Sequence, residues 1–365
     1  MKILLDNKFY VRPGVKIFRE ADNLIHFSSP YTCDRYWLKN NKEILDIIEN
    51  LEKDKSLYDI LNKLNLSSSY IKDNNLSDSI CFLCEKEVIG QKPFETSLSE
   101  LEIEFYYNNI FHLNFLFKKN GLDLQEKLKK KCICIIGVGG TGTSLLVSLI
   151  GMGIGHIKLI DHDVISADNL PRQMFYKYSD IGKSKVDKMK KYINNLNPFI
   201  NVENFNICLN NKNKSKIKNI FKDCDLIIVA ADEPDYIVIL NQVQEFCFEM
   251  NLPFIGGAAG DGFIPPLVIP YKSACIKCML KALPQDQYKK YIHDNDSKLK
   301  LDRFMWPYMS VPYYKLLEGN TFVAREVLKF LLFQKSDLIN NFYTSMSSNL
   351  KFIPKLKNCI CNKKS

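Results

Sequence analysis

A glycine-rich turn followed by an acidic residue is a combination that could bind a nucleotide. The glycines of the turn are Gly137, Gly139, Gly140 and Gly142. They let the backbone approach phosphate oxygens closely, and the helix predicted after them over 143–152 would offer free N–H groups and the positive end of its dipole. Asp161 lies at the end of the predicted strand 157–160, where its carboxylate could accept hydrogen bonds from ribose hydroxyls. The pattern predicts a nucleotide-binding βαβ unit rather than an ordinary turn.

Cationic side chains that follow Asp161 indicate which nucleotide chemistry fits. Arg172 lies in the segment 168–173, Asp-Asn-Leu-Pro-Arg-Gln, and Lys185 ends the segment 182–185, Gly-Lys-Ser-Lys. A hydride-transfer enzyme with a nicotinamide or flavin does not need cations that converge on the phosphates. An enzyme that attacks a nucleotide at its α-phosphate does need them, because negative charge develops on the phosphate oxygens. We therefore favour phosphate chemistry over redox chemistry.

Asp232 is a candidate ligand for a metal ion. It closely follows the apolar run 226–230, and the carboxyl ends of parallel strands form the edge at which such sheets bind ligands. A Mg²⁺ ion that bridges phosphate oxygens would need a carboxylate there. The alternative interpretation is a surface turn or helix cap before Pro234.

The elements that must position these residues alternate along the second part of the chain. Predicted strands lie at 132–136, 157–160, 202–207, 226–230 and 253–258, and predicted helices lie at 143–152, 185–196 and 321–332. Apolar, β-branched runs of this length are typical of buried parallel strands. The alternation predicts an α/β fold with a doubly wound, mainly parallel Rossmann-like sheet.

Taken together, these motifs resemble the ThiF, MoeB and HesA family of ubiquitin-activating-enzyme-like adenylyltransferases. The shared pattern runs from about 128 to 361: the glycine loop, Asp-x-Asp-x-Val with Ile165 in the valine place, Asn-Leu-x-Arg-Gln and Gly-x-x-Lys. The resemblance implies ATP and Mg²⁺ as cofactors. The residues that it assigns to nucleotide, phosphate and metal binding are Gly137, Gly139, Gly140, Gly142, Asp161, Asp163, Asn169, Arg172, Lys185 and Asp232.

Two close cysteine pairs suggest a second metal. They are Cys275-Ile-Lys-Cys278 and, near the C-terminus, Cys359-Ile-Cys361. Two such pairs can complete a tetrahedral thiolate site. Members of the resembled family commonly hold zinc with two Cys-x-x-Cys pairs, and the second pair here is one residue shorter. We expect a structural Zn²⁺ rather than four free thiols.

The first 95 residues are predicted to form a separate small domain. Segments 9–12 and 15–18 flank Pro13-Gly14 and predict a hairpin, and 24–27 predicts a third strand. Helical periodicity follows at 43–51 and at 57–64. This composition suggests a winged-helix-like α+β domain, followed by a helical linker over 96–130 and the adenylyltransferase domain with its zinc site over 131–365.

Within the family, the chain resembles the microcin-C-type peptide adenylyltransferases most, through 229–234, 256–258 and the extra N-terminal domain. That resemblance implies a short ribosomally made peptide as substrate, bound by the N-terminal domain through strand addition. It implies adenylylation of the peptide C-terminus with release of pyrophosphate, in the biosynthesis of a peptide-nucleotide antibiotic. A dimerisation or packing role for the N-terminal domain is the alternative.

Two other functions stay open. The first is activation of a ubiquitin-fold sulfur-carrier protein, against which the extra N-terminal domain speaks. The second is a catalytically dead peptide-binding scaffold, because the segment 106–109 lacks the arginine that family members often carry there. Lys118 or Lys119 could replace that arginine. No cysteine occurs between Cys278 and Cys359, so a thioester route has no nucleophile.

Composition limits the remaining possibilities. The 365 residues are 46% hydrophobic and carry a formal charge of +9, mostly from lysine runs interleaved with Asn and Ile. We interpret these runs as solvated helix faces rather than as a nucleic-acid site, since no nucleic-acid motif accompanies them. No apolar run is long enough for a membrane span, and the N-terminus lacks a signal peptide. We expect a cytoplasmic protein with reduced thiols, which forms homodimers and binds neither nucleic acid nor membrane.

Overall fold

The structure is a computed structural model of the 365-residue chain. It describes residues 8–12, 14–19, 24–29, 35–39, 42–51, 55–66, 76–90, 96–233, 235–258, 263–283, 313–344 and 349–362. The chain forms two compact units, residues 1–127 and residues 128–365. The boundary falls inside the segment 96–130, for which we expected a helical linker.

The second unit is built on a five-stranded parallel sheet with the order β10-β9-β6-β7-β8. The strands are β6 (Cys132–Ile136), β7 (His156–Ile160), β8 (Asn201–Phe205), β9 (Leu226–Val229) and β10 (Phe254–Gly256). The chain runs from the central β6 outward to β7 and β8, and then returns to β9 and β10 on the other side. The predicted doubly wound α/β sheet is therefore confirmed.

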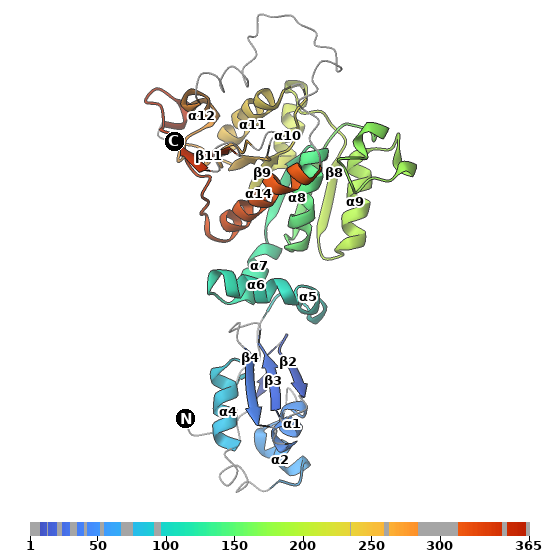
Figure 1. The fold of residues 1–365 in the computed structure, drawn as a ribbon, viewed down its shortest axis with the longest axis vertical. Helices are drawn as coiled ribbons and strands as arrows, with labels where there is room; N and C mark the ends of the chain where they lie inside the picture. Colours follow the sequence, from blue (N-terminus) through green and yellow to red (C-terminus); the bar gives the residue numbers. More distant parts are fainter. Residues whose placement is uncertain are drawn as a thin grey trace, which may run out of the picture. The chain divides into compact units, whose positions relative to one another are not determined.

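Helices cover both faces of this sheet (Figure 1). The main ones are α8 (Gly140–Gly151), α9 (Lys185–Leu196), α10 (Lys214–Phe221), α11 (Tyr236–Met250), α12 (Ile276–Ala282) and α14 (Tyr313–Phe333). Helix α8 packs on α14, and α11 packs on α10 and α12. Because both faces are covered, β6 and β9 are buried at every residue, which explains their uninterrupted apolar sequences.

The end of the chain adds a small antiparallel sheet to this unit. Strand β11 (Asn341–Thr344) pairs with β12 (Asn349–Phe352). Ile264 forms an isolated bridge with Tyr343, and Leu267 forms one with Ile339. Residues 267 and 268 are held by such single bridges. Residues 284–312 lie outside the described part of the chain.

The first unit contains a three-stranded antiparallel sheet with the order β2-β3-β4. Its strands are β2 (Lys16–Arg19), β3 (Leu24–Ser28) and β4 (Arg35–Lys39). Burial alternates along β3, where Ile25 and Phe27 enter the core. On the opposite face, Phe18 and Trp37 stack on either side of His26, with ring centroids 5.4 and 5.1 Å apart.

The hairpin predicted around Pro13-Gly14 is wrong. Strand β1 (Tyr10–Val11) pairs with β5 (Ile89–Gly90), and the segment after the glycine pairs with β3 instead. Strand β4 was not predicted. The Arg12 guanidinium lies 3.0 Å from the Glu87 carboxylate beside the β1–β5 pair. Pairing with this distant segment takes the place of the predicted pairing with the residues just after Gly14.

Helices complete the first unit. They are α1 (Lys42–Glu49), α2 (Leu57–Lys63), α4 (Leu76–Glu85), α5 (Glu100–Phe105), α6 (Tyr107–Phe117) and α7 (Gly121–Lys129), which crosses into the second unit. The two predicted helices at 43–51 and 57–64 are confirmed as α1 and α2. The Tyr107 hydroxyl lies 3.0 Å from that of Ser28, and Lys16 lies over the Tyr107 ring, so α6 contacts the β2-β3-β4 sheet.

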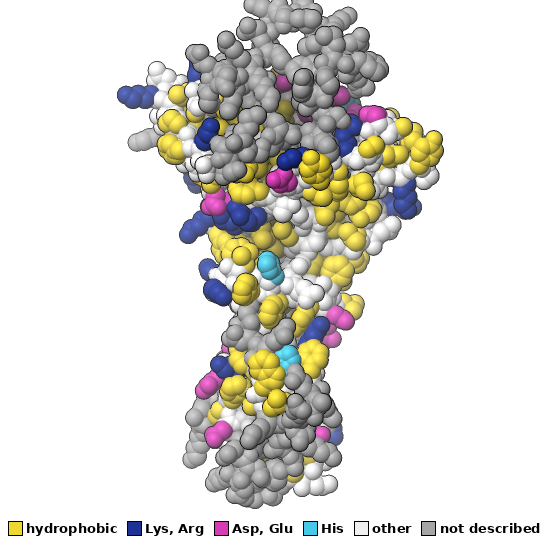
Figure 2. Space-filling view, viewed as in Figure 1, with side chains coloured by type: hydrophobic (Ala, Val, Ile, Leu, Met, Phe, Trp, Pro, Cys, Tyr) yellow, Lys and Arg dark blue, Asp and Glu magenta, His cyan; other side chains and the backbone are white. Residues whose placement is uncertain are grey.

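On the face in Figure 2, Lys and Arg side chains of the described residues lie in several small groups between hydrophobic and uncharged areas. In the described part of the chain, no helix combines the length and the apolar character that a membrane span requires.

Candidate functional site

The glycine turn lies where the strand order of the sheet reverses, between the carboxyl ends of β6 and β9. Gly137 has φ +91°, and a Cβ there would lie 2.7 Å from the backbone of Ala230. A Cβ on Gly142 would lie 2.0 Å from the Gly137 carbonyl oxygen. Both positions therefore require glycine, one for its backbone conformation and close approach, the other for close approach alone. Doubly wound sheets bind ligands at this point of the fold.

The first turn of α8 is built to receive a negatively charged group. Gly139 is its N-cap and has no side chain with which to cap the helix. The Thr143 hydroxyl donates back to the Gly139 carbonyl oxygen at 2.7 Å, so it does not occupy the N–H groups of the turn. These N–H groups and the helix dipole suit phosphate oxygens.

Asp161 ties the glycine turn to the end of β7. Its two carboxylate oxygens accept hydrogen bonds from the backbone N–H groups of Val138 and Asp163, each at 2.8 Å. These bonds fix the carboxylate at the carboxyl edge of the sheet. Each oxygen keeps a further lone pair, so the site can still accept a ribose hydroxyl.

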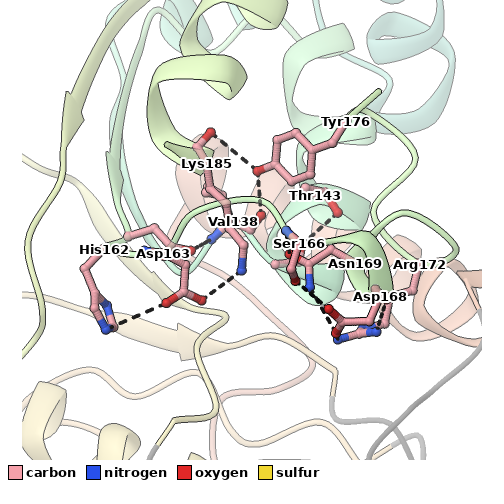
Figure 3. A network of polar contacts seen from close by, with 12 residues as sticks. Val138, Thr143, His162, Asp163, Ser166, Asp168, Asn169, Arg172, Tyr176 and Lys185 are labelled. Carbon is pink, nitrogen blue, oxygen red and sulfur yellow. Dashed lines mark hydrogen bonds and ion pairs between the residues drawn. The ribbon is translucent and has the colours of Figure 1, made fainter. Parts of the chain in front are cut away.

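Lys185 is held in place by Asp163. The Lys185 ammonium lies 2.8 Å from the Asp163 carboxylate, and its side chain is only 7% exposed. A bridge between Val164 and Ser184 joins the two loops that carry the pair, and the backbone N–H of Lys185 donates to the Asp163 carbonyl oxygen at 3.1 Å. Figure 3 shows Asp163 between Lys185 and His162.

Asp168 holds the second cationic group. Arg172 donates to the backbone oxygen of Asp168 at 2.6 Å and lies 3.5 Å from its carboxylate. The amide of Asn169 donates to the same carboxylate at 3.3 Å, and the Ser166 hydroxyl donates to it at 2.5 Å. The Ser166 hydrogen bond is the main reason why the pKa of Asp168 lies below its ordinary value. Figure 3 shows this group beside the Lys185 group.

Asp232 follows β9 on the other side of the glycine turn. Its side chain reaches solvent, yet the surrounding protein desolvates it and so raises its pKa, and the charge of Glu233 raises the pKa further. The charges of Lys185 and Arg172 act in the opposite direction. Asp232 follows the carboxyl end of β9, and the segment that carries Arg172 and Lys185 follows that of β7, so the parallel sheet brings all three charged groups to one edge.

Three residues that sequence reasoning did not assign support this site. The Tyr176 hydroxyl is buried and donates to the Val138 carbonyl oxygen at 2.8 Å, which links the segment after Arg172 to the glycine turn. Ser166 and Asp168 orient Asn169 and Arg172, as described above. The Asn169 side-chain oxygen accepts the backbone N–H of Ser166 at 3.2 Å, so the spacing Ser166-x-x-Asn169 was a signal that could have identified Ser166.

The four predicted zinc ligands form one buried cluster. Cys275, Cys278, Cys359 and Cys361 place their sulfur atoms within 4.8 Å of one another. Three of the separations are 3.8, 3.3 and 3.5 Å. Tetrahedral bonds of about 2.3 Å to zinc place sulfur atoms about 3.8 Å apart, so the donors fit this ion. The backbone N–H of Leu356 lies 3.4 Å from the Cys278 sulfur, as in the outer shells of thiolate sites.

The fold, the glycine turn and the converging charges define a nucleotide-binding α/β protein. The chain belongs to the ThiF family, whose family model matches residues 111–361. Molybdopterin-synthase adenylyltransferase of Haemophilus influenzae is 33% identical over 158 residues, which are 43% of this chain and 61% of that protein. Adenylyltransferase and sulfurtransferase UBA4 of Scheffersomyces stipitis is 32% identical over 163 residues, which are 45% of this chain and 36% of that protein. The matches therefore span less than two thirds of these relatives.

Solved structures of similar fold extend along nearly the whole chain. E. coli MccB in complex with MccA-N7isoASN has a TM-score of 0.60 and 23% identity, and the match covers 97% of this chain and 99% of that chain. The structure of E. coli MccB with ATP gives 0.58 and 23%, with 96% and 98% covered. PaaA gives 0.59 and 20%, with 94% and 100% covered. These likenesses support the fold of both units.

Proposed function

We propose that the protein is an ATP-dependent adenylyltransferase that modifies the C-terminus of a short ribosomally made peptide. An oxygen of the terminal carboxylate, or a group derived from a terminal amide, attacks the α-phosphorus of ATP. The bond from that phosphorus to the oxygen shared with the β-phosphorus breaks, and pyrophosphate leaves with this oxygen. The product is an adenylylated peptide, a precursor of a peptide-nucleotide antibiotic.

The residues of the site would bind different parts of the nucleotide and its metal ion. The N–H groups of the glycine turn and of the first turn of α8 bind the phosphates, and Asp161 and Asp163 lie toward the ribose. Asn169, Arg172 and Lys185 contact the phosphates, and the two cations stabilise the charge that develops on the α-phosphoryl oxygens. Asp232 would hold Mg²⁺, which neutralises charge on bridging phosphate oxygens.

The position of Lys185 carries this proposal. The Lys185 side chain is only 7% exposed at the same edge of the sheet as the glycine turn, and a charge taken out of water is costly unless the site compensates or uses it. The phosphates of a nucleotide would supply the negative charge that this edge of the sheet is prepared to bind. The buried cysteine cluster would hold a structural Zn²⁺ by Cys275, Cys278, Cys359 and Cys361.

The choice of a peptide rests on the N-terminal unit. The likeness to MccB, several of whose structures contain MccA, covers 99% of that chain and therefore includes a counterpart of the N-terminal unit. The second candidate substrate is a ubiquitin-fold sulfur carrier. It is favoured by the curated relatives, a molybdopterin-synthase adenylyltransferase and UBA4, whose matches span only part of this chain.

Pyrophosphate release tests the proposed chemistry. With Mg-ATP and a library of short synthetic peptides, we expect pyrophosphate release that falls roughly 100- to 1000-fold in Lys185→Ala. Lys188→Ala is the matched control, because Lys188 lies one turn further along α9 and also pairs with a carboxylate, that of Asp180 at 2.5 Å. Asp232→Ala should lose most of the Mg²⁺-dependent rate. Equal rates in the two lysine variants would contradict the assignment of Lys185.

A substrate comparison separates the two candidates. A library of short peptides and a ubiquitin-fold carrier that ends in Gly-Gly are offered to the same enzyme preparation, and adenylylated products are identified by mass spectrometry. We expect adenylylated peptide. Adenylylation of the carrier alone would replace the peptide proposal by the second candidate.

A further inference from the structure

A closed ring of polar contacts joins three elements beside the glycine turn. Asn320 of α14 accepts the backbone N–H of Ala258 through Oδ1 at 2.9 Å and donates from Nδ2 to the Ser144 hydroxyl at 2.8 Å. Ser144 donates to the backbone oxygen of Thr141 at 2.8 Å, and the Thr141 hydroxyl donates to the backbone oxygen of Ala258 at 3.5 Å. The ring thus runs from α14 to α8, then to the segment 257–258, and back.

Asn320 is fully buried in a helix whose other buried residues are mostly apolar. A buried amide is tolerated only when its donor and acceptor are bound, and here both are. An apolar side chain at this position would leave the Ala258 N–H without a partner in a buried place. Packing alone therefore does not explain why α14 carries an asparagine there.

The ring holds a segment that is already confined by close packing. A Cβ on Gly257 would lie 2.4 Å from the Thr141 side chain, and a Cβ on Gly319 would lie 2.5 Å from that of Ala258. The Tyr236 hydroxyl donates to the Gly257 carbonyl oxygen at 2.6 Å, and the Gly257 N–H donates to Val229 at 2.8 Å. The segment 257–258 is therefore a rigid support against which the first turn of α8 rests.

We infer that Asn320 is a positioning residue that fixes the first turn of α8 for ligand binding. It touches no reacting group, and it acts through Ser144 and Ala258 on Thr141, the second residue of α8. The N–H groups of this turn are the proposed phosphate donors, so small displacements of the turn weaken binding at a preorganised site. Only the expected effect on nucleotide binding rests on the proposed function; the positioning of the first turn of α8 by Asn320 does not.

The test compares two buried asparagines that contact α8. Asn197 is also buried and donates to the Ile150 carbonyl oxygen at 2.9 Å, near the C-terminal end of α8. We expect Asn320→Ala to weaken Mg-ATP binding in calorimetry by roughly ten- to hundredfold, and Asn197→Ala to change it less than about threefold at a similar loss of melting temperature. Equal effects in the two variants would reduce Asn320 to a packing residue.

Amide hydrogen exchange gives a readout that needs no nucleotide. In Asn320→Ala the amide of Ala258 and that of Thr143, whose N–H donates to the Gly139 carbonyl oxygen at 3.0 Å, should exchange faster, while the last turn of α8 keeps its protection. Ser144→Ala, which leaves Asn320 in place, should reproduce part of this effect if Asn320→Ala does not fold. Unchanged exchange at Ala258 and Thr143 would overturn the inference. If the unmodified protein binds no ATP, the proposed function fails, and the exchange result alone decides the role of Asn320.

Discussion

Lys185 and Arg172 carry the same charge, but the protein holds them in different ways. Lys185 is almost completely buried and pairs with Asp163. The Arg172 side chain is 30% exposed and pairs with Asp168, four residues earlier in the chain. A desolvated ammonium responds strongly to a charge that arrives nearby, because little water screens it. Lys185 therefore suits the fixed part of a phosphate site, and Arg172 suits a part that adjusts to the ligand.

The raised pKa of Asp232 gives a prediction at the level of single residues. Under the proposed function Asp232 must be ionised to bind Mg²⁺, and both desolvation and the Glu233 charge favour its neutral form. Glu233→Gln removes one negative charge, so the pKa of Asp232 falls. The acid limb of the profile of kcat/KM against pH should then move to lower pH, because this profile reports the free enzyme.

The control for this experiment is Glu249→Gln. Glu249 lies at the far end of α11, where its carboxylate pairs with Lys214 and Lys218. We expect this variant to keep the profile of the unmodified protein. An acid limb that moves to higher pH in Glu233→Gln, or that moves equally in both variants, would contradict the role of Asp232.

At the level of elements, two glycines of α8 should respond in opposite directions to the same substitution. Gly142→Ala places a methyl group 2.0 Å from the Gly137 carbonyl oxygen, whereas a Cβ on Gly151 would meet nothing within 4 Å. Gly142→Ala should lower the free energy of unfolding by about 1–3 kcal/mol through overpacking. Gly151→Ala should raise it by up to about 1 kcal/mol, since alanine favours helix more than glycine does. Urea unfolding measures both, and a stabilised Gly142→Ala variant would refute the close approach.

The elements that the sequence predicts well are those with a strong local pattern. The strand 132–136 and the helix 185–196 agree with β6 and α9 to the residue, because continuous apolar runs and helical periodicity are local signals. The hairpin at Pro13-Gly14 fails for the opposite reason. Its first strand pairs with Ile89 and Gly90, and no local pattern encodes a partner so distant in the sequence.

In the candidate site, too, the residues with a local sequence pattern could be predicted and those defined by contacts across the fold could not. The glycines, the acidic residues and the cations could be found from motif spacing, and the structure gathers them at one edge of the sheet. Tyr176 and Asn320 could not be found in this way, because their roles depend on contacts across the fold, to Val138 and to Ala258. A polar residue at a core position of a helical pattern, such as Asn320, is the signal that remains in the sequence.

At the scale of the molecule, the cysteine cluster ties the end of the chain to the sheet unit. Cys275 and Cys278 flank the start of α12, and Cys359 and Cys361 come from the last described turn of the chain. We predict one equivalent of zinc by elemental analysis. Chelation or Cys275→Ser should lower the melting temperature on the order of 10 °C, because metal binding contributes directly to folding. Cys208→Ser, a half-buried thiol outside the cluster, should have little effect. Pure protein without zinc would refute the site.

Under the proposed function, the N-terminal unit binds the peptide substrate and does not bind the nucleotide. All residues of the nucleotide site belong to the unit 128–365, so the N-terminal unit with its sheet β2-β3-β4 has a different role. A flexible peptide has many conformations and few anchoring side chains. Pairing of its main chain with an edge strand of this sheet, β2 or β4, would supply affinity with little demand on its sequence.

Deletion of residues 1–95 tests this division of labour. We expect the shortened chain to bind Mg-ATP within about twofold of the full chain, since its nucleotide site is intact, and to bind a peptide substrate at least roughly tenfold more weakly, because strand pairing is lost. Calorimetry measures both affinities. Retention of one equivalent of zinc shows that the remaining unit is folded, which separates loss of the peptide site from general unfolding. If the shortened chain binds peptide as tightly as the full chain, the N-terminal unit is a packing or dimerisation element instead.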